Sequence, residues 1–88
     1  MVQAQIGEEV RSFLLGTDTF RELIGDAGID RATPLLEQGI LDSIGIFELV
    51  GFLETRFQIR LSSQDIVESH FRDLASIESF VARKLPGA

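Results

Sequence analysis

Apolar residues recur at helical spacing along most of this chain. Three stripes have the three- and four-residue spacing of a helix with one buried face, in residues 4–15, 43–57 and 74–85. The stripes consist of Ile6, Val10, Phe13 and Leu14; Ile46, Leu49, Val50, Leu53 and Phe57; and Leu74, Ile77, Phe80, Val81 and Leu85. Alternation typical of a strand occurs only briefly, in residues 58–61. The pattern predicts an all-α protein.

Polar residues at the segment boundaries indicate where the long helices begin and end. Gly16 ends the first helix. Asp42 is a preferred N-cap residue for a helix over 43–57, and Asp73 is one for the last helix. In that last helix, residues 83–84 are basic and complement the C-terminal end of the helix dipole, and residues 86–87 (Pro-Gly) stop the helix.

A short third helix is expected between the last two long ones. Ser62 would cap it, with Asp65 at its third position. Ile66, Val67 and Phe71 would then face the core over one or two turns.

The connection between the first two long helices is unusually long. It has room for a short helix over 18–25, capped by Asp18 and stopped by Gly25. Further on, Leu35 and Leu36 follow the break imposed by a proline and are expected to fold back onto the core.

Length and composition predict one small domain spanning residues 1–88. A chain of this size buries only about 60–65% of its unfolded surface. It has no cysteine and a single histidine, so disulfides or a metal cannot staple it. The core must therefore come from its aliphatic residues and seven phenylalanines.

The net charge of −6 argues against nucleic acid and anionic membranes as partners, and favours basic protein surfaces. No apolar run approaches the roughly 18 residues that span a bilayer, and the first residues do not begin a signal peptide. The expected location is the cytoplasm.

Ser43 is a candidate functional residue because of its position at the start of a predicted helix. It falls in the first turn of the 43–57 helix, beside unpaired backbone N–H groups and the positive end of the helix dipole. An anion attached to its hydroxyl would be stabilised there. The hydroxyl also lies off the core stripe, which leaves it accessible.

The residues around Ser43 resemble a known signature. The sequence of residues 39–44, Gly-Ile-Leu-Asp-Ser-Ile, is similar to the Gly-x-Asp-Ser-Leu/Ile motif of acyl and peptidyl carrier proteins. The short motif alone would be a weak indication. The resemblance becomes specific through residues 34–39 before the motif, the apolar helix after it, and residues 71–74 with the last helix at the family's spacing. In that family the matching serine carries phosphopantetheine, transferred from coenzyme A, through a phosphodiester.

The resemblance implies a four-helix bundle of the acyl-carrier type, with a short third helix and a long first connection. It implies a monomeric, non-catalytic carrier that is modified by a phosphopantetheinyl transferase. An acyl- or aminoacyl-loading ligase or adenylation enzyme, and a downstream synthase or transferase, would be its other partners. Asp42 would present an acid to the transferase. Gly39 would allow the turn into the motif, although an ordinary flexible loop glycine is an alternative.

A second face of the 43–57 helix carries apolar residues outside the core stripe. Ile44, Phe47 and Gly51 share an arc with Ser43. Either the long connection covers Phe47, or these residues form a docking surface for partner enzymes; the sequence favours docking. Gly51 would either provide a shallow notch for a partner side chain or permit close packing, and Ile66 of the third helix would lie near the attachment site.

Two other functions compete with the carrier. A hydrolase would use Ser43, His70 and an acidic residue, but the motif is not a nucleophile elbow and no oxyanion hole is evident. A non-catalytic helical interaction module without a prosthetic group would use Ser43 only as a helix-start residue.

The cargo is less well defined than the carrier. By the resemblance, housekeeping fatty-acid carriers place an acidic residue where Gly45 stands, and their second helix is strongly acidic. The corresponding helix here has only Glu48 and Glu54 as acids, partly offset by Arg56. This favours specialised metabolism of the polyketide or nonribosomal-peptide type.

Overall fold

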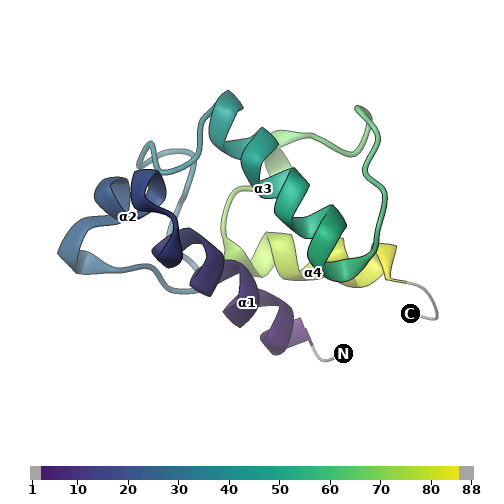
Figure 1. The fold of residues 1–88 in the computed structure, drawn as a ribbon, viewed down its shortest axis with the longest axis horizontal. Coiled ribbons are helices and arrows are strands. Elements are labelled where there is room, and N and C mark those ends of the chain that lie inside the picture. The colour runs from purple at the N-terminus through teal and green to yellow at the C-terminus, as the bar shows by residue number, and fades with distance from the viewer. Residues whose placement is uncertain (1–2, 86–88) are drawn as a thin grey trace.

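The computed structural model describes residues 3–85, and these form an all-α fold without strands. The α-helices are α1 (Gln3–Gly16), α2 (Asp18–Ile24), α3 (Ser43–Phe57) and α4 (Leu74–Lys84), as Figure 1 shows. Two single turns of 3-10 helix, η1 (Gly25–Ala27) and η2 (Glu68–His70), lie in the connections. The predicted all-α fold with four helices is confirmed.

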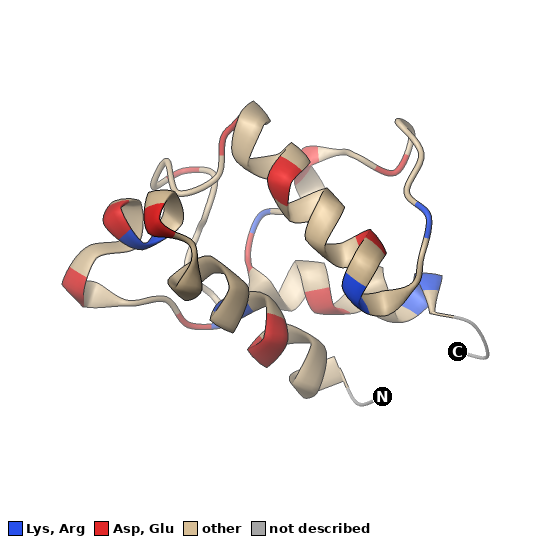
Figure 2. Cartoon of the chain, viewed as in Figure 1, with Lys and Arg blue, Asp and Glu red and all other residues tan. Residues whose placement is uncertain are grey.

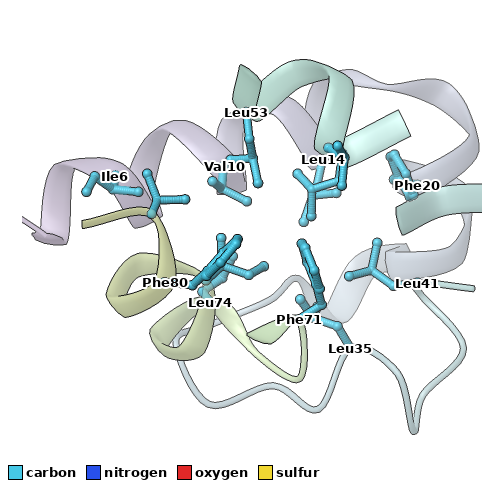
Figure 3. Packing of buried hydrophobic residues seen from close by; sticks show 14 of the residues in the cluster. Ile6, Val10, Leu14, Phe20, Leu35, Leu41, Leu53, Phe71, Leu74 and Phe80 are labelled. Carbon is cyan, nitrogen blue, oxygen red and sulfur yellow. The ribbon is translucent and has the colours of Figure 1, made fainter. Parts of the chain in front are cut away.

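The three predicted stripes meet in one core. α1 packs mainly against α4 and α2. α3 lies alongside α1 (Figure 1), and side chains from all four α-helices converge on the core (Figure 3). Most stripe residues are buried, whereas Phe13, Ile46 and Leu85 are half-buried at the edge of the core. Phe13 stacks on Phe52 of α3, with ring centroids 4.3 Å apart, and so joins α1 to α3.

The first connection begins with the expected short helix, although its cap differs from the prediction. Thr17, not Asp18, is the N-cap residue of α2, and its side chain makes no capping hydrogen bond. Asp18 is the first helical residue and pairs with Arg21 at 2.6 Å. Gly25 ends the helix as predicted, with a φ of 67° that favours glycine.

A buried carboxylate ties this connection to α4. Glu78 is 1% exposed and accepts hydrogen bonds from Arg31: its Oε1 from Nη2 at 2.6 Å and from Nε at 3.1 Å, and its Oε2 from Nε at 3.3 Å. The hydrogen bonds to Glu78, together with the negative charge of that carboxylate, raise the pKa of Arg31 above its ordinary value. The Arg31 carbonyl also accepts a bond from Ala75 N–H at 3.1 Å. Both links hold the connection against the start of α4.

Gly7 of α1 provides the space for this carboxylate. A Cβ at position 7 would lie 1.8 Å from Glu78 Oε2. Glycine therefore lets α1 pass α4 with Glu78 in its paired position, whereas a larger residue would displace the Glu78 side chain.

Replacement of Gly7 by alanine should destabilise the protein. Alanine favours a helix interior by about 1 kcal/mol over glycine, but overpacking costs about 1–3 kcal/mol, and here it also displaces the paired carboxylate. We expect a lower midpoint in urea unfolding. The control is Gly16→Ala, because a Cβ there meets nothing within 4 Å. A Gly7→Ala protein as stable as wild type would contradict the close packing at Glu78.

The segment expected to form a third α-helix does not do so. Residues 63–65 form a turn, Val67 is extended (φ −122°, ψ 148°), and only η2 follows. The predicted helix start is present as a local cap: the Asp65 carboxylate accepts from Ser62 N–H at 2.9 Å. Extended backbone at a β-branched residue then ends the helical path.

The predicted inward residues of this segment are only partly buried as expected. Phe71 is fully buried and Ile66 is half-buried against the core. Val67 is 42% exposed, so its prediction as a core residue is wrong. Because the backbone is extended there, the helical periodicity that would turn Val67 inward does not apply.

Asp65 should make stability depend on acid pH. Lys84 Nζ lies 2.8 Å from Asp65 Oδ2, and hydrogen bonds from Lys84 and then from Ser62 N–H lower the pKa of Asp65 below its ordinary value. A lowered pKa in the folded state gives stability that is present above the unfolded pKa and is lost as pH falls through the folded value. We therefore expect Asp65→Asn to melt below wild type at pH 7, with the difference disappearing at strongly acid pH. A difference that is constant with pH would contradict this.

Candidate attachment site

The start of α3 is organised by Asp42. Its Oδ1 accepts a hydrogen bond from Gly45 N–H at 2.7 Å, and its carbonyl accepts one from Ile46 N–H at 2.8 Å. Asp42 is thus the N-cap residue and Ser43 the first residue of the helix, as predicted. The predicted cap of α4 by Asp73 is confirmed in the same way, through Ser76 N–H at 2.7 Å.

The turn before α3 fixes this helix start to the core. The Leu35 carbonyl accepts bonds from Ile40 and Leu41 N–H at 2.9 and 3.1 Å, and all three side chains are buried. Leu35 N–H donates to the Arg72 carbonyl at 2.8 Å. Gly39 has a φ of 75°, so the turn requires a glycine-type conformation.

Ser43 itself is exposed. Within residues 3–85 no hydrogen bond engages its hydroxyl. An open groove of about 410 Å³ lies beside it, lined by Leu36, Glu37, Leu41, Asp42, Ser43, Ile46 and Glu68. The hydroxyl can therefore be reached from solvent and has space for an attached group.

The outer face of α3 is uncovered. Ile44 is 71% and Phe47 68% exposed, and Gly51 is exposed beside them. The alternative in which the long connection folds over Phe47 is therefore wrong, because α2 packs on Gly45 instead. The predicted role of Ile66 stays a prediction; it is Glu68, from the same segment, that lines the groove.

His70 contacts α4 and the segment before η2. Its ring stacks on Phe80 of α4 at 4.2 Å, and its Nδ1 lies 2.9 Å from the Asp65 carbonyl. These contacts give His70 a packing role.

Acidic residues lie around the end of α3 that carries Ser43. Asp42 caps this end and Glu48 follows in the second turn, whereas the other end holds both Glu54 and Arg56, which pairs with Glu9 of α1 (Figure 2). Glu37 and Glu68 add two more acids around the groove. The surface around Ser43 is thus acidic and complements a basic partner.

Comparison with known proteins identifies the family. The family described as phosphopantetheine attachment site matches residues 17–82. The chain belongs to this family. It is also similar to "Probable acyl carrier protein PigG" from Serratia sp. (strain ATCC 39006), with 38% identity over 56 residues. That match covers 64% of this chain and 64% of the relative. The sequence-based assignment to the carrier protein family is confirmed, with phosphopantetheine as its covalent prosthetic group.

The start of α3 fits this prosthetic group. The Ser43 hydroxyl is accessible, the helix N-terminus favours a phosphate, and the groove has space beside it. When bound, phosphopantetheine supplies a thiol on a flexible arm. Within the described residues, no helix is long and apolar enough to cross a membrane, and no cluster of side chains could hold a metal ion.

Sequence reasoning did not identify Phe20 as a neighbour of the attachment site. Phe20 is 2% exposed, and its ring lies against Gly45, two residues after Ser43. Its partner is 25 positions away in a different helix, and no periodicity in either segment indicates the pairing.

Replacement of Asp42 by alanine should weaken the site in two ways. Loss of the bond to Gly45 N–H removes the cap and costs about 0.5–2 kcal/mol of stability. Loss of the acid should also slow modification by a basic transferase by more than the stability loss explains. The measurements are a thermal melt and the modification rate below the melting range. An unchanged modification rate in a folded Asp42→Ala protein would show that Asp42 only caps the helix and is not recognised by the transferase.

Proposed function

We propose that this protein is an acyl or aminoacyl carrier in which Ser43 bears 4'-phosphopantetheine. The observation that supports this most directly is the accessible Ser43 hydroxyl at the capped start of α3, beside an open groove. Ser43 Oγ forms the phosphodiester with the phosphopantetheine of coenzyme A, and adenosine bisphosphate leaves. The protein's own residues then present the arm and bind partner enzymes. The thiol of the arm holds the cargo as a thioester.

The same proposal covers the partners. A phosphopantetheinyl transferase, a loading ligase or adenylation enzyme, and a downstream synthase or transferase would each approach the end of α3 that carries Ser43. Exposed Ile44 and Phe47 provide apolar contact there, and Gly51 leaves a gap between side chains. The protein acts as a cytoplasmic monomer, and it is the substrate of these enzymes rather than a catalyst.

Specialised polyketide or nonribosomal-peptide metabolism is the pathway type that we propose. Phe20 lies against Gly45, so that any side chain at position 45, such as the acidic one of housekeeping fatty-acid carriers, would require the Phe20 ring to shift. The relative from Serratia is itself named as an acyl carrier protein. Loading of the phosphopantetheinylated protein with a panel of fatty, aryl and amino acids would identify the class of cargo.

One experiment separates the three candidate functions. The purified protein is incubated with a broad-specificity phosphopantetheinyl transferase and coenzyme A, and its intact mass is measured. A carrier gains the mass of one phosphopantetheine group. An interaction module gains nothing, and a hydrolase would instead cleave a chromogenic ester without the transferase. Absence of any mass gain would overturn the proposed function.

A further inference from the structure

The first connection contacts α3 at the turn that carries Ser43. Phe20 of α2 is 2% exposed and lies against Gly45. A Cβ at position 45 would be 2.9 Å from Phe20 Cε1 and 3.3 Å from Asp42 Oδ1. Glycine is therefore the residue that leaves both the phenyl ring and the Asp42 cap undisturbed.

This contact stabilises the first turn of α3, the part of the helix with the least stability of its own. The first turn of a helix has few internal hydrogen bonds, and glycine weakens a helix further. Here Gly45 N–H is held by Asp42 Oδ1 at 2.7 Å, and the ring of Phe20 covers the adjacent Gly45 backbone. Without the ring, solvent reaches the turn and glycine permits non-helical backbone. Ser43, two residues away, would lose its fixed position.

Phe20 is in turn held by the aromatic cluster between α1 and α3. The Phe13 ring lies 6.0 Å from that of Phe20 and stacks on Phe52 at 4.3 Å. Through Phe13, the aromatic cluster thus holds α2 in place in addition to its contact with Gly45. Phe52 belongs to the same cluster but lies in the middle of α3, away from Ser43, which makes it a matched control.

We propose that Phe20 is a positioning residue for phosphopantetheine transfer, acting through Gly45 to keep the first turn of α3 helical. The inference rests on the proposed function, since Ser43 must be the attachment site. If the transferase binds the helical form of the turn, fraying lowers the competent fraction of the carrier. The apparent KM for the carrier then rises by the inverse of that fraction, while kcat stays unchanged.

The test compares Phe20→Leu with Phe52→Leu, both as full-length protein. Amide hydrogen exchange on the unmodified protein should be faster at Gly45 and Ile46 in Phe20→Leu, with a smaller change at Leu53. Transferase kinetics with coenzyme A should show a KM for the Phe20→Leu carrier about three- to tenfold higher at similar kcat. Phe52→Leu should keep the wild-type KM, even if its melting temperature falls as far.

A second pair of variants approaches the same contact from α3. Gly45→Ala pushes against the Phe20 ring and should also raise KM, although alanine favours helix. Shortening the ring in the double variant Phe20→Leu with Gly45→Ala should restore KM toward wild type. Equal KM changes in Phe20→Leu and Phe52→Leu, or no recovery in the double variant, would overturn the role of Phe20 alone. Failure of the wild type to gain mass would overturn the proposed function, and this role with it.

Discussion

The Ser43→Ala protein is expected to gain no mass from a phosphopantetheinyl transferase and coenzyme A, while keeping the wild-type fold. The hydroxyl oxygen is the only non-hydrogen atom that this substitution removes. It lies exposed at the first residue of α3, where alanine suits the helix at least as well as serine. A thermal melt should therefore show little change, and the intact mass should show complete loss of the modification.

Other exposed serines make this result specific. Ser12 is exposed on α1, so Ser12→Ala removes a comparable hydroxyl away from the capped start of α3. That control should gain the mass of one phosphopantetheine group at the wild-type rate. Modification of Ser43→Ala at Ser12, Ser62 or Ser63 would show that accessibility, not the position at the start of α3, selects the hydroxyl.

The parts of the site that the sequence predicts are those built from local interactions. The Asp42 cap joins residues three positions apart, and the bounds of α3 follow from that cap and from one apolar stripe. Gly39 at positive φ is likewise a local requirement of the turn. Interactions between residues this close in the sequence can be predicted from the sequence alone.

The contacts that the sequence does not reveal join distant segments. Glu78 reads as a polar residue of α4, yet it is buried because Gly7 leaves space and Arg31 covers it, and these partners are far away along the chain. Phe20 reads as the apolar side of a short helix, with no sign that Gly45 is its partner. Only the packing of α1 against α4 and of α2 against α3 brings these groups together.

The error in the third helix has a different origin. Ser62 and Asp65 do form the predicted local cap, but a cap alone does not propagate a helix. Lys84 of α4 also binds the Asp65 carboxylate, and the backbone is extended at Val67, two residues later. Long-range pairing and a β-branched residue thus outweighed a correct start signal.

Truncation of Leu53 to alanine should give one of the largest losses of stability available in α3. Leu53 is fully buried where α3 meets the core, and deleting a buried leucine side chain costs about 2–5 kcal/mol. Val50→Ala should cost less, because valine is smaller and 7% exposed. Both losses should appear as lower midpoints in thermal and urea unfolding.

Phe47→Ala should leave stability nearly unchanged and lower the modification rate, although it removes a larger side chain from the same helix. Phe47 is 68% exposed, and surface substitutions usually change stability by less than about 0.5 kcal/mol. Its loss should instead weaken productive contact with the transferase or loading enzyme, because large aromatic side chains dominate interface energetics. Ile44→Ala should act similarly but more mildly, since it lies nearer the helix end.

The comparison needs a melt and a modification rate for each of these variants under the same conditions. The decisive result is a crossed pattern, in which Leu53→Ala loses stability and Phe47→Ala loses rate at temperatures where both remain folded. A Phe47→Ala protein that melts as low as Leu53→Ala would place Phe47 in the core. Unchanged melting and unchanged rates with both transferase and loading enzyme would instead remove Ile44 and Phe47 from the docking surface, leaving recognition to the acidic residues around Ser43.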